Sequence, residues 1–335
     1  MIAELGLVWL FLIVGVGIAV LLAGGELLVR GATSLARKLG VPALIVGLTI
    51  VAFGTSAPEM VVSAAAAFEG APGLAIGNIV GSNIANILLV LGLPAVIAPL
   101  ATRATGVGRN AVIALALTAV FIWMGLNDGA LTRTEGVALA IGIVVYLIYL
   151  AIAARAAKDD PVIAELTDVD HMDGLPQNGA LIAVYSLAGL VLLPLGAQLI
   201  VEGSVGIARE FEVSEAVIGL TILAFGTSLP ELATALVAAA RKQAEMAIGN
   251  VIGSNIFNIC AVGGITGIAG SIAVEGTVAV ENVTFDFAVM AAAMIAATAL
   301  VLSGRPLGRR LGLIFALGYV AYILALLVRN TAMFG

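Results

Sequence analysis

Two segments of the sequence carry the same oxygen-bearing side chains at the same spacing within strongly apolar runs. In VGLTIVAFGTSAPEM, the residues Thr55, Ser56 and Glu59 lie at positions i, i+1 and i+4, within one helical turn. The run IGLTILAFGTSLPEL repeats the arrangement with Thr227, Ser228 and Glu231. A glutamate inside an apolar helix is costly and is usually functional. The alternative, a protonated structural glutamate, is disfavoured because the two glutamates occupy equivalent positions.

A proline precedes each of these glutamates. Pro58 has no N–H, so the carbonyl of Gly54 loses its helical partner and the turn between them is loosened. Pro230 and Gly226 repeat this pattern. A carbonyl freed within lipid must find another partner, and a cation can serve as one.

Two further apolar runs carry asparagine and serine at intervals of four residues. The run AIGNIVGSNIANI contains Asn78, Ser82 and Asn86, and the run AIGNVIGSNIFNI contains Asn250, Ser254 and Asn258. Each set forms a stripe on one helix face. Together with the glutamates they form an all-oxygen set, which suits hard cations such as Ca²⁺ and Na⁺ and disfavours Zn²⁺ or Cu²⁺. The neighbouring Asn83 and Asn255 point about 100° away and are expected to hold helices together.

The composition places these motifs in a membrane. The chain has 335 residues, of which 61% are hydrophobic and 11% charged, whereas a soluble domain has about 25% charged residues. A spanning helix needs about 20 apolar residues, and the sequence predicts an all-α polytopic membrane protein with ten spans. The first begins almost at Met1 without a basic start or a cleavage site and is read as a retained helix. The predicted spans are 5–29, 42–68, 74–100, 108–126, 134–154, 179–201, 214–240, 246–272, 282–303 and 309–328.

Several classes of function are excluded or disfavoured. The net charge of −6 argues against nucleic acid as a partner. The single cysteine, Cys260, rules out an intramolecular disulfide and a thiolate cluster. The predicted spans contain no histidine, and no serine or threonine has an evident base besides the two glutamates, which disfavours an intramembrane hydrolase. Polar residues gather near midplane alone, whereas a cation channel needs a continuous polar path. We therefore expect no enzyme and no cofactor.

The chain contains an internal repeat. The paired motifs share one offset of 172 residues without a gap, and the match extends back to 24–41 and 196–213. Five spans per half is an odd number, so the halves, 1–154 and 179–335, are predicted to lie inverted in the membrane. Inverted repeats are typical of secondary transporters, whose substrates bind between the repeats near midplane. An acidic linker, 155–178, joins the halves.

Lysine and arginine residues predict the orientation, because cytoplasmic loops hold the excess. The sparse side has only Arg133, Arg209 and Arg329. Both termini therefore face outward and the linker is cytoplasmic, in the cell membrane. Near the cytoplasmic boundary, Glu26 has Arg30 one turn later and is expected to pair with it. The basic residues of the rich side are Arg30, Arg37, Lys38, Arg103, Arg109, Arg155, Lys158, Arg241, Lys242, Arg305, Arg309 and Arg310.

The GTSAPE, GTSLPE and GSNI motifs resemble the paired α-repeats of the calcium/cation antiporter superfamily, in particular its sodium/calcium exchanger branch in a compact prokaryotic form. The similarity is sharpest over 46–92 and 218–264. It implies exchange of Na⁺ for Ca²⁺ by alternating access, with three Na⁺ for one Ca²⁺. Some relatives carry Asp where this chain has Asn258, and that Asp is associated with K⁺ dependence. The implied ligands are the carbonyls of Ala52 and Ala224 and the side chains of Thr55, Ser56, Glu59, Ser82, Asn86, Thr227, Ser228, Glu231, Ser254 and Asn258.

One alternative stays open within the same superfamily. With both glutamates ionised the site carries −2, which one Ca²⁺ or two Na⁺ would neutralise. In a Ca²⁺/H⁺ antiporter, protons on the glutamates would replace Na⁺. Hydroxyl groups beyond those that Ca²⁺ needs favour Na⁺.

Overall fold

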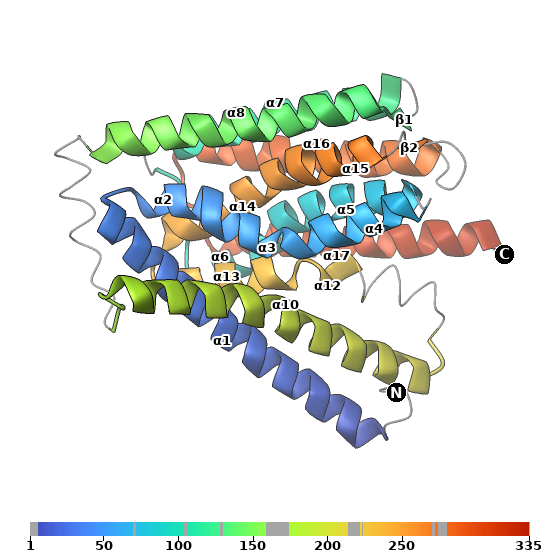
Figure 1. Ribbon diagram of the computed structural model, residues 1–335. Helices are drawn as coiled ribbons and strands as arrows, with labels where there is room; N and C mark the ends of the chain where they lie inside the picture. Colours follow the sequence, from blue (N-terminus) through green and yellow to red (C-terminus); the bar gives the residue numbers. More distant parts are fainter. Residues whose placement is uncertain are drawn as a thin grey trace.

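The computed structural model describes residues 6–69, 72–103, 106–127, 130–158, 174–213, 222, 224–269, 272–273 and 280–334, most of them helical (Figure 1). The elements of the first half are α1 (Leu7–Leu39), α2 (Ala43–Val46), the π-helical η2 (Gly47–Val51), α3 (Ala52–Thr55), α4 (Ala57–Phe68), α5 (Pro72–Ala85), the π-helical η3 (Asn86–Val90), α6 (Gly92–Ile97), α7 (Val107–Asn127), β1 (Ala130–Leu131) and α8 (Arg133–Lys158). Those of the second half are α10 (Gly179–Glu210), α12 (Ala224–Gly226), α13 (Leu229–Ala240), α14 (Ala244–Phe257), the π-helical η5 (Asn258–Val262), α15 (Gly263–Ala269), β2 (Ile272–Ala273), α16 (Val280–Leu302) and α17 (Arg309–Phe334).

The helices are those of a multi-pass membrane protein. Within the described parts of the chain, eight helices are long and apolar enough to cross a membrane. A ninth span arises if the segments Ala43–Thr55 and Ala57–Phe68, bent by 44° at Ser56, are counted as one. The predicted span 214–240 lies partly outside the described residues, as does most of the predicted linker. Ten spans thus remain a prediction.

The first and sixth predicted spans belong to helices that are longer than the apolar runs. We predicted spans over 5–29 and 179–201, and the helices continue to Leu39 and Glu210. Polar residues in these extensions do not stop a helix that has already nucleated. The first helix ends at Gly40, whose φ of 66° is the left-handed conformation that closes many helices.

These two helices pack closely along their length (Figure 1). Each carries glycine every seven residues, and the two sets are related by the repeat offset: Gly17, Gly24 and Gly31 on α1, and Gly189, Gly196 and Gly203 on α10. A Cβ added at Gly24 would lie 2.9 Å from the Leu193 nitrogen, and one at Gly196 would lie 2.5 Å from the Leu21 nitrogen. Partner numbers fall on α10 as they rise on α1. The helices are therefore antiparallel, and each contact is repeated by the equivalent residues of the two helices, as across an approximate two-fold axis.

Two short β contacts also join the two halves at equivalent places. Leu131 pairs with Ile272 in the antiparallel β1–β2 ladder. Leu100, which precedes Ile272 by the repeat offset, forms an isolated antiparallel bridge with Leu307. In each case the segment after an asparagine-bearing helix of one half meets the loop between the last two long helices of the other half. The segments 73–97 and 244–269 are the most buried of the long apolar helices, and they place the asparagine stripes at the centre.

Candidate ion-binding site

Each glutamate of the repeat lies in the first turn of a helix that begins directly after an interruption of the preceding helix. The helix α3 ends at Thr55, and Ser56 has φ −82° and ψ 2°, outside helical geometry. The helix α4 then begins with Pro58 and Glu59 in its first turn, where a proline costs no hydrogen bond. In the second half, Ser228 has φ −88° and ψ 4° before α13. The loosened turn predicted from Pro58 and Gly54 is thus a bend centred on Ser56.

Both asparagine stripes end in a π-helical turn. The helix α5 becomes π-helical at Asn86, and α14 does so at Asn258. The wider turn is shown by the N–H of Leu91, which donates to the carbonyl of Asn86 at 3.0 Å. Such turns within α-helices are rare and often occur at functional sites. Here both coincide with equivalent asparagines.

Hydrogen bonds bring the motifs of the two halves together. The Ser56 Oγ donates to Oε1 of Glu231 at 3.2 Å. The Thr55 Oγ1 donates to Oδ1 of Asn250 at 3.2 Å and lies 3.5 Å from Oγ of Ser254. Thr227 donates in the opposite sense, from Oγ1 to Oδ1 of its counterpart asparagine, Asn78, at 3.5 Å. The threonine of each half therefore contacts the first asparagine of the other half.

Each first asparagine also holds the glutamate segment of its own half. Nδ2 of Asn78 lies 3.4 Å from the carbonyl of Glu59, to which it donates. Nδ2 of Asn250 does the same to the carbonyl of Glu231 at 3.5 Å. These bonds fix the asparagine-bearing helices against the helices that begin at the glutamates.

The site is buried and rich in oxygen atoms without partners. Glu59 is 1% exposed and Glu231 is 0% exposed. Among the described residues, the buried side-chain atoms of the predicted ligands that lack a hydrogen-bond partner are both carboxylate oxygens of Glu59, Oε2 of Glu231, Oγ of Ser82 and Ser228, and the side-chain amides of Asn86 and Asn258. Buried polar groups are normally paired. An oxygen cluster of this kind is suited to bind cations that supply the missing partners.

The predicted ligands differ in their hydrogen bonds and in their burial. Hydrogen bonds join Thr55, Ser56, Glu231 and Ser254 across the halves. The carbonyl of Ala52 accepts the N–H of Ser56 at 3.0 Å and Oγ1 of Thr55 at 3.4 Å. The other side-chain ligands are buried or, for Thr227, half-buried, and Ala224 begins α12. Shared ligation of an ion by all twelve residues stays a prediction.

Two groups of residues were not among the predicted ligands. Asn78 and Asn250 belong to the predicted stripes, and the structure makes them the link between the halves. Ser63 is fully buried and accepts a hydrogen bond from Nδ2 of Asn78 at 2.9 Å. The available signal was its spacing, because Ser63 follows Glu59 by four residues and so lies on the same helix face. The predicted role of Asn255 in holding helices agrees with its Nδ2 donating to the carbonyl of Asn83 at 3.4 Å.

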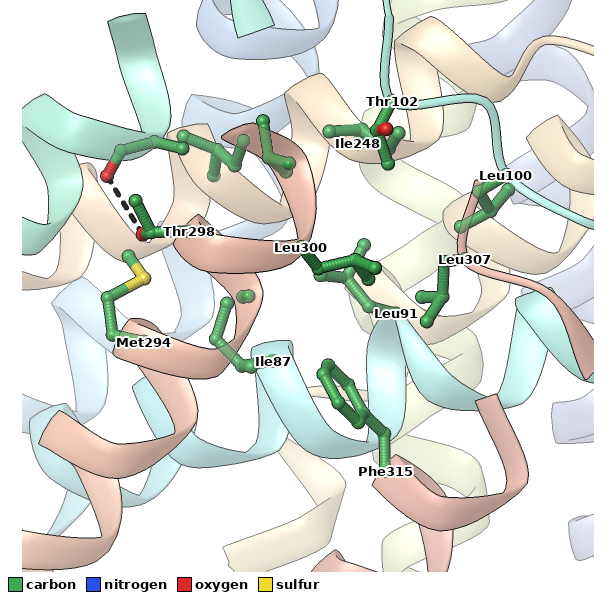
Figure 2. A pocket seen from close by; sticks show the side chains of 14 residues that line it. Ile87, Leu91, Leu100, Thr102, Ile248, Met294, Thr298, Leu300, Leu307 and Phe315 are labelled. Carbon is green, nitrogen blue, oxygen red and sulfur yellow. Dashed lines mark hydrogen bonds between the residues drawn. The ribbon is translucent and has the colours of Figure 1, made fainter. Parts of the chain in front are cut away.

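The donor set defines the chemistry of the site. It offers two carboxylates, amide and hydroxyl oxygens, and carbonyls. The described residues contain no group of three or more His, Cys, Asp or Glu side chains placed to hold a metal. Few formal charges among many neutral oxygens suit hard cations that are bound and released. The cavity in Figure 2 is a separate, apolar space next to η3, lined by residues such as Ile87, Met294 and Phe315.

Comparisons with known proteins agree with this geometry. The family model described as sodium/calcium exchanger protein matches residues 9–154 and 181–328. The chain is 31% identical to the sodium/calcium exchanger MaX1 of Methanosarcina acetivorans, covering 94% of this chain and 98% of that protein. It is 37% identical to the inner membrane protein YrbG of Escherichia coli, covering 75% of this chain and 77% of that protein. Its fold matches a solved structure of the sodium-calcium exchanger NCX_Mj with a TM-score of 0.79 and 32% identity, over 96% and 98% of the two chains.

Proposed function

The chain belongs to the sodium/calcium exchanger protein family, and from this premise we propose that it exchanges Na⁺ for Ca²⁺ across the cell membrane by alternating access. The observation that carries the proposal is the buried oxygen cluster around Glu59 and Glu231, in which Glu59 has no hydrogen-bond partner for either carboxylate oxygen. A cation bound there would satisfy atoms that the described protein groups leave unpaired. The twelve ligands predicted from the sequence are retained as the proposed ion ligands.

The charge of the site accounts for competition between the two ions. Two ionised glutamates are neutralised by one Ca²⁺ or by two Na⁺, so either load leaves no unpaired charge in a region of low dielectric. A third Na⁺ adds one positive charge, and a cycle of three Na⁺ for one Ca²⁺ then moves net charge across the membrane. Each moved charge is worth about 2.3 kcal/mol per 100 mV.

We further propose that the architecture is ten spans in two inverted halves, 1–154 and 179–335, joined by the linker 155–178. The antiparallel pairing of α1 with α10, helices related by the repeat offset, supports the inversion. The two related β contacts support it as well.

Ion dependence of uptake tests the exchange. Purified protein in liposomes is loaded with Na⁺, with K⁺, or with neither but with a pH step, and uptake of radiolabelled Ca²⁺ is followed. We expect uptake to be driven by the Na⁺ gradient. An inside-positive membrane potential should stimulate it, because a cycle of three Na⁺ out for one Ca²⁺ in moves one positive charge out of the liposome. Uptake driven by the pH step alone would identify a Ca²⁺/H⁺ antiporter instead.

Labelling tests the orientation. Cysteines at Ala101 and Thr134, both exposed positions, are introduced singly into a Cys260→Ala background. We expect an impermeant maleimide to reach Thr134→Cys from outside the cell and Ala101→Cys only from the cytoplasm. Labelling of both from the same side would overturn the predicted topology, including the outward-facing termini.

A further inference from the structure

A cluster of charges joins α1 to the end of α13, outside the ion site. Glu26 accepts from Nε of Arg30 at 2.5 Å, as its spacing in the sequence predicted. It also accepts two hydrogen bonds from Arg241, the residue at the end of α13: one from Nε at 3.0 Å and a shorter one from Nη2. The side chain of Glu26 is 27% exposed and that of Arg30 is 24% exposed. One carboxylate thus binds two guanidinium groups, one of them from the other half of the chain.

The helices α1 and α13 are in close contact next to this cluster. A Cβ at Gly25 would lie 3.3 Å from both the carbonyl oxygen of Ala233 and Cγ2 of Val237. Ala233 is accordingly 1% exposed, although it lies only two residues after Glu231. The helix α1 therefore covers α13 from the glutamate region to the end at Arg241.

The equivalent surface in the first half is uncovered. The counterpart of Ala233 by the repeat offset is Val61 on α4, and Val61 is 69% exposed. If α10 covered α4 as α1 covers α13, Val61 would be buried. The antiparallel pair α1–α10 therefore sits asymmetrically on the helices that carry the two glutamates: it covers one and leaves the other open.

The charges at the equivalent positions cannot form the same cluster. The counterparts of Glu26, Arg30 and Arg241 are Gln198, Glu202 and Glu69. Gln198 donates to Oε1 of Glu202 at 2.7 Å, and Glu69 is exposed. Moving α10 onto α4 in the symmetry-related way would bring an amide and two carboxylates together, with no cation among these three side chains. Like charges at short distance repel.

We propose that Glu26, Arg30 and Arg241 form an ionic latch that holds α1 against α13 and stabilises the state in which that side of the ion site is covered. The inference rests on the proposed exchange function, because covering and uncovering the site from its two sides is what alternating access requires. When α1 leaves α13 the latch breaks, and the opposite side offers no equivalent latch. The two access states therefore differ in stability, and the latched state is favoured.

A distance measurement tests the latch without using transport. Spin labels are placed at the exposed positions Leu39 on α1 and Ala240 on α13, through cysteines in the full chain carrying Cys260→Ala, in lipid nanodiscs. Pulsed electron resonance then gives the distribution of the label separation. We expect one dominant, short separation in the parent, and in Glu26→Gln an increase of about fivefold in the population with longer separations, the effect expected for a partly exposed ion pair.

Three further variants separate the latch from a general structural effect. Lys242→Gln, which removes the exposed positive charge next to Arg241 without touching the cluster, should leave the distribution unchanged. The charge swap Glu26→Arg/Arg241→Glu again places one carboxylate between two guanidinium groups and should restore the short separation. The double variant Gln198→Glu/Glu69→Arg gives the opposite side a cation within reach of a carboxylate, and should itself increase the longer separations.

The outcomes decide two questions independently. A distribution that Glu26→Gln leaves unchanged, or a charge swap that folds but does not restore the short separation, overturns the latch even where Na⁺-driven Ca²⁺ uptake is intact. Absence of that uptake in the parent, with the predicted changes in separation, overturns the proposed function and leaves the latch as a conformational device of this fold.

Discussion

Glu59 and Glu231 sit in nearly identical sequence motifs, yet the folded protein treats them differently. Glu231 accepts a hydrogen bond from Ser56, whereas neither carboxylate oxygen of Glu59 has a partner. The helix α13, which carries Glu231 in its first turn, is covered by α1, whereas α4, which carries Glu59, leaves Val61 69% exposed. The motif alone therefore does not set the environment of its glutamate. The packing of the α1–α10 pair contributes to the difference, because α1 covers α13, whereas Val61 on α4 stays exposed.

The asparagine stripes show the same contrast. Asn250 is fully buried within α14, which is buried continuously from Met246 to Phe257, whereas Asn78 is half-buried. Asn78 has Ser63 as a second partner, and the counterpart of Ser63 is Ala235. The first half thus adds a polar contact at the position where it is less covered.

The largest effect is expected at the glutamates and tests whether the contrast matters for ion binding. Glu59→Gln and Glu231→Gln should each lower Na⁺-driven Ca²⁺ uptake by about a hundredfold or more, because each removes half of the formal charge and replaces a carboxylate ligand with a neutral amide. Uptake of radiolabelled Ca²⁺ into Na⁺-loaded liposomes measures the loss. As a control, both variants should elute as folded protein but lose the thermal stabilisation that Ca²⁺ gives the parent. Near-normal uptake by either variant would rule out a shared site.

The next effect concerns the equivalent asparagines. Asn258→Asp should change the site charge from −2 to as much as −3, and an added carboxylate in low dielectric must be matched by a cation or a proton. Exchange by this variant should become sensitive to K⁺ or require acid, as measured by uptake across K⁺ concentrations and pH. The parent should neither require nor transport K⁺.

Asn86→Asp is the matched variant for that experiment. An equal response would show that the two asparagines contribute alike to the ion site despite their different surroundings. A response of Asn258→Asp alone would sharpen the contrast between the halves. An Asn258→Asp variant with the ion and pH dependence of the parent would place residue 258 outside the site.

The smallest effect is expected at the contact that only the first half has. Ser63→Ala removes the 2.9 Å acceptor of Asn78 and leaves its amide with the longer bond to the Glu59 carbonyl. Loss of one such bond should raise the Ca²⁺ concentration for half-maximal uptake about three- to tenfold. The matched variant Ala235→Ser should change it less than about twofold, since Asn250 is already held in a fully buried helix. Equal effects would remove the distinction between the halves at this position.

The sequence by itself determined the membrane class, the repeat and the chemistry of the candidate site. Apolar runs long enough to span a bilayer, a constant offset of 172 residues, and oxygen-bearing residues at helical spacing are local properties of the chain, so they can be read without a fold. The Glu26–Arg30 pair was predictable for the same reason, because its partners are one turn apart. The carbonyl ligands Ala52 and Ala224 were expected from family resemblance alone.

Only the tertiary structure decided how the halves differ. The contact of Glu26 with Arg241 spans 215 residues of sequence, and no local pattern in the sequence predicts it. The burial of Ala233 and the exposure of Val61 depend on where the helices α1 and α10 pack, although both residues follow equivalent glutamates. Local spacing fixes which side chains share a helix face. It cannot fix which of two equivalent faces a distant helix covers, because the two arrangements differ by long-range contacts alone.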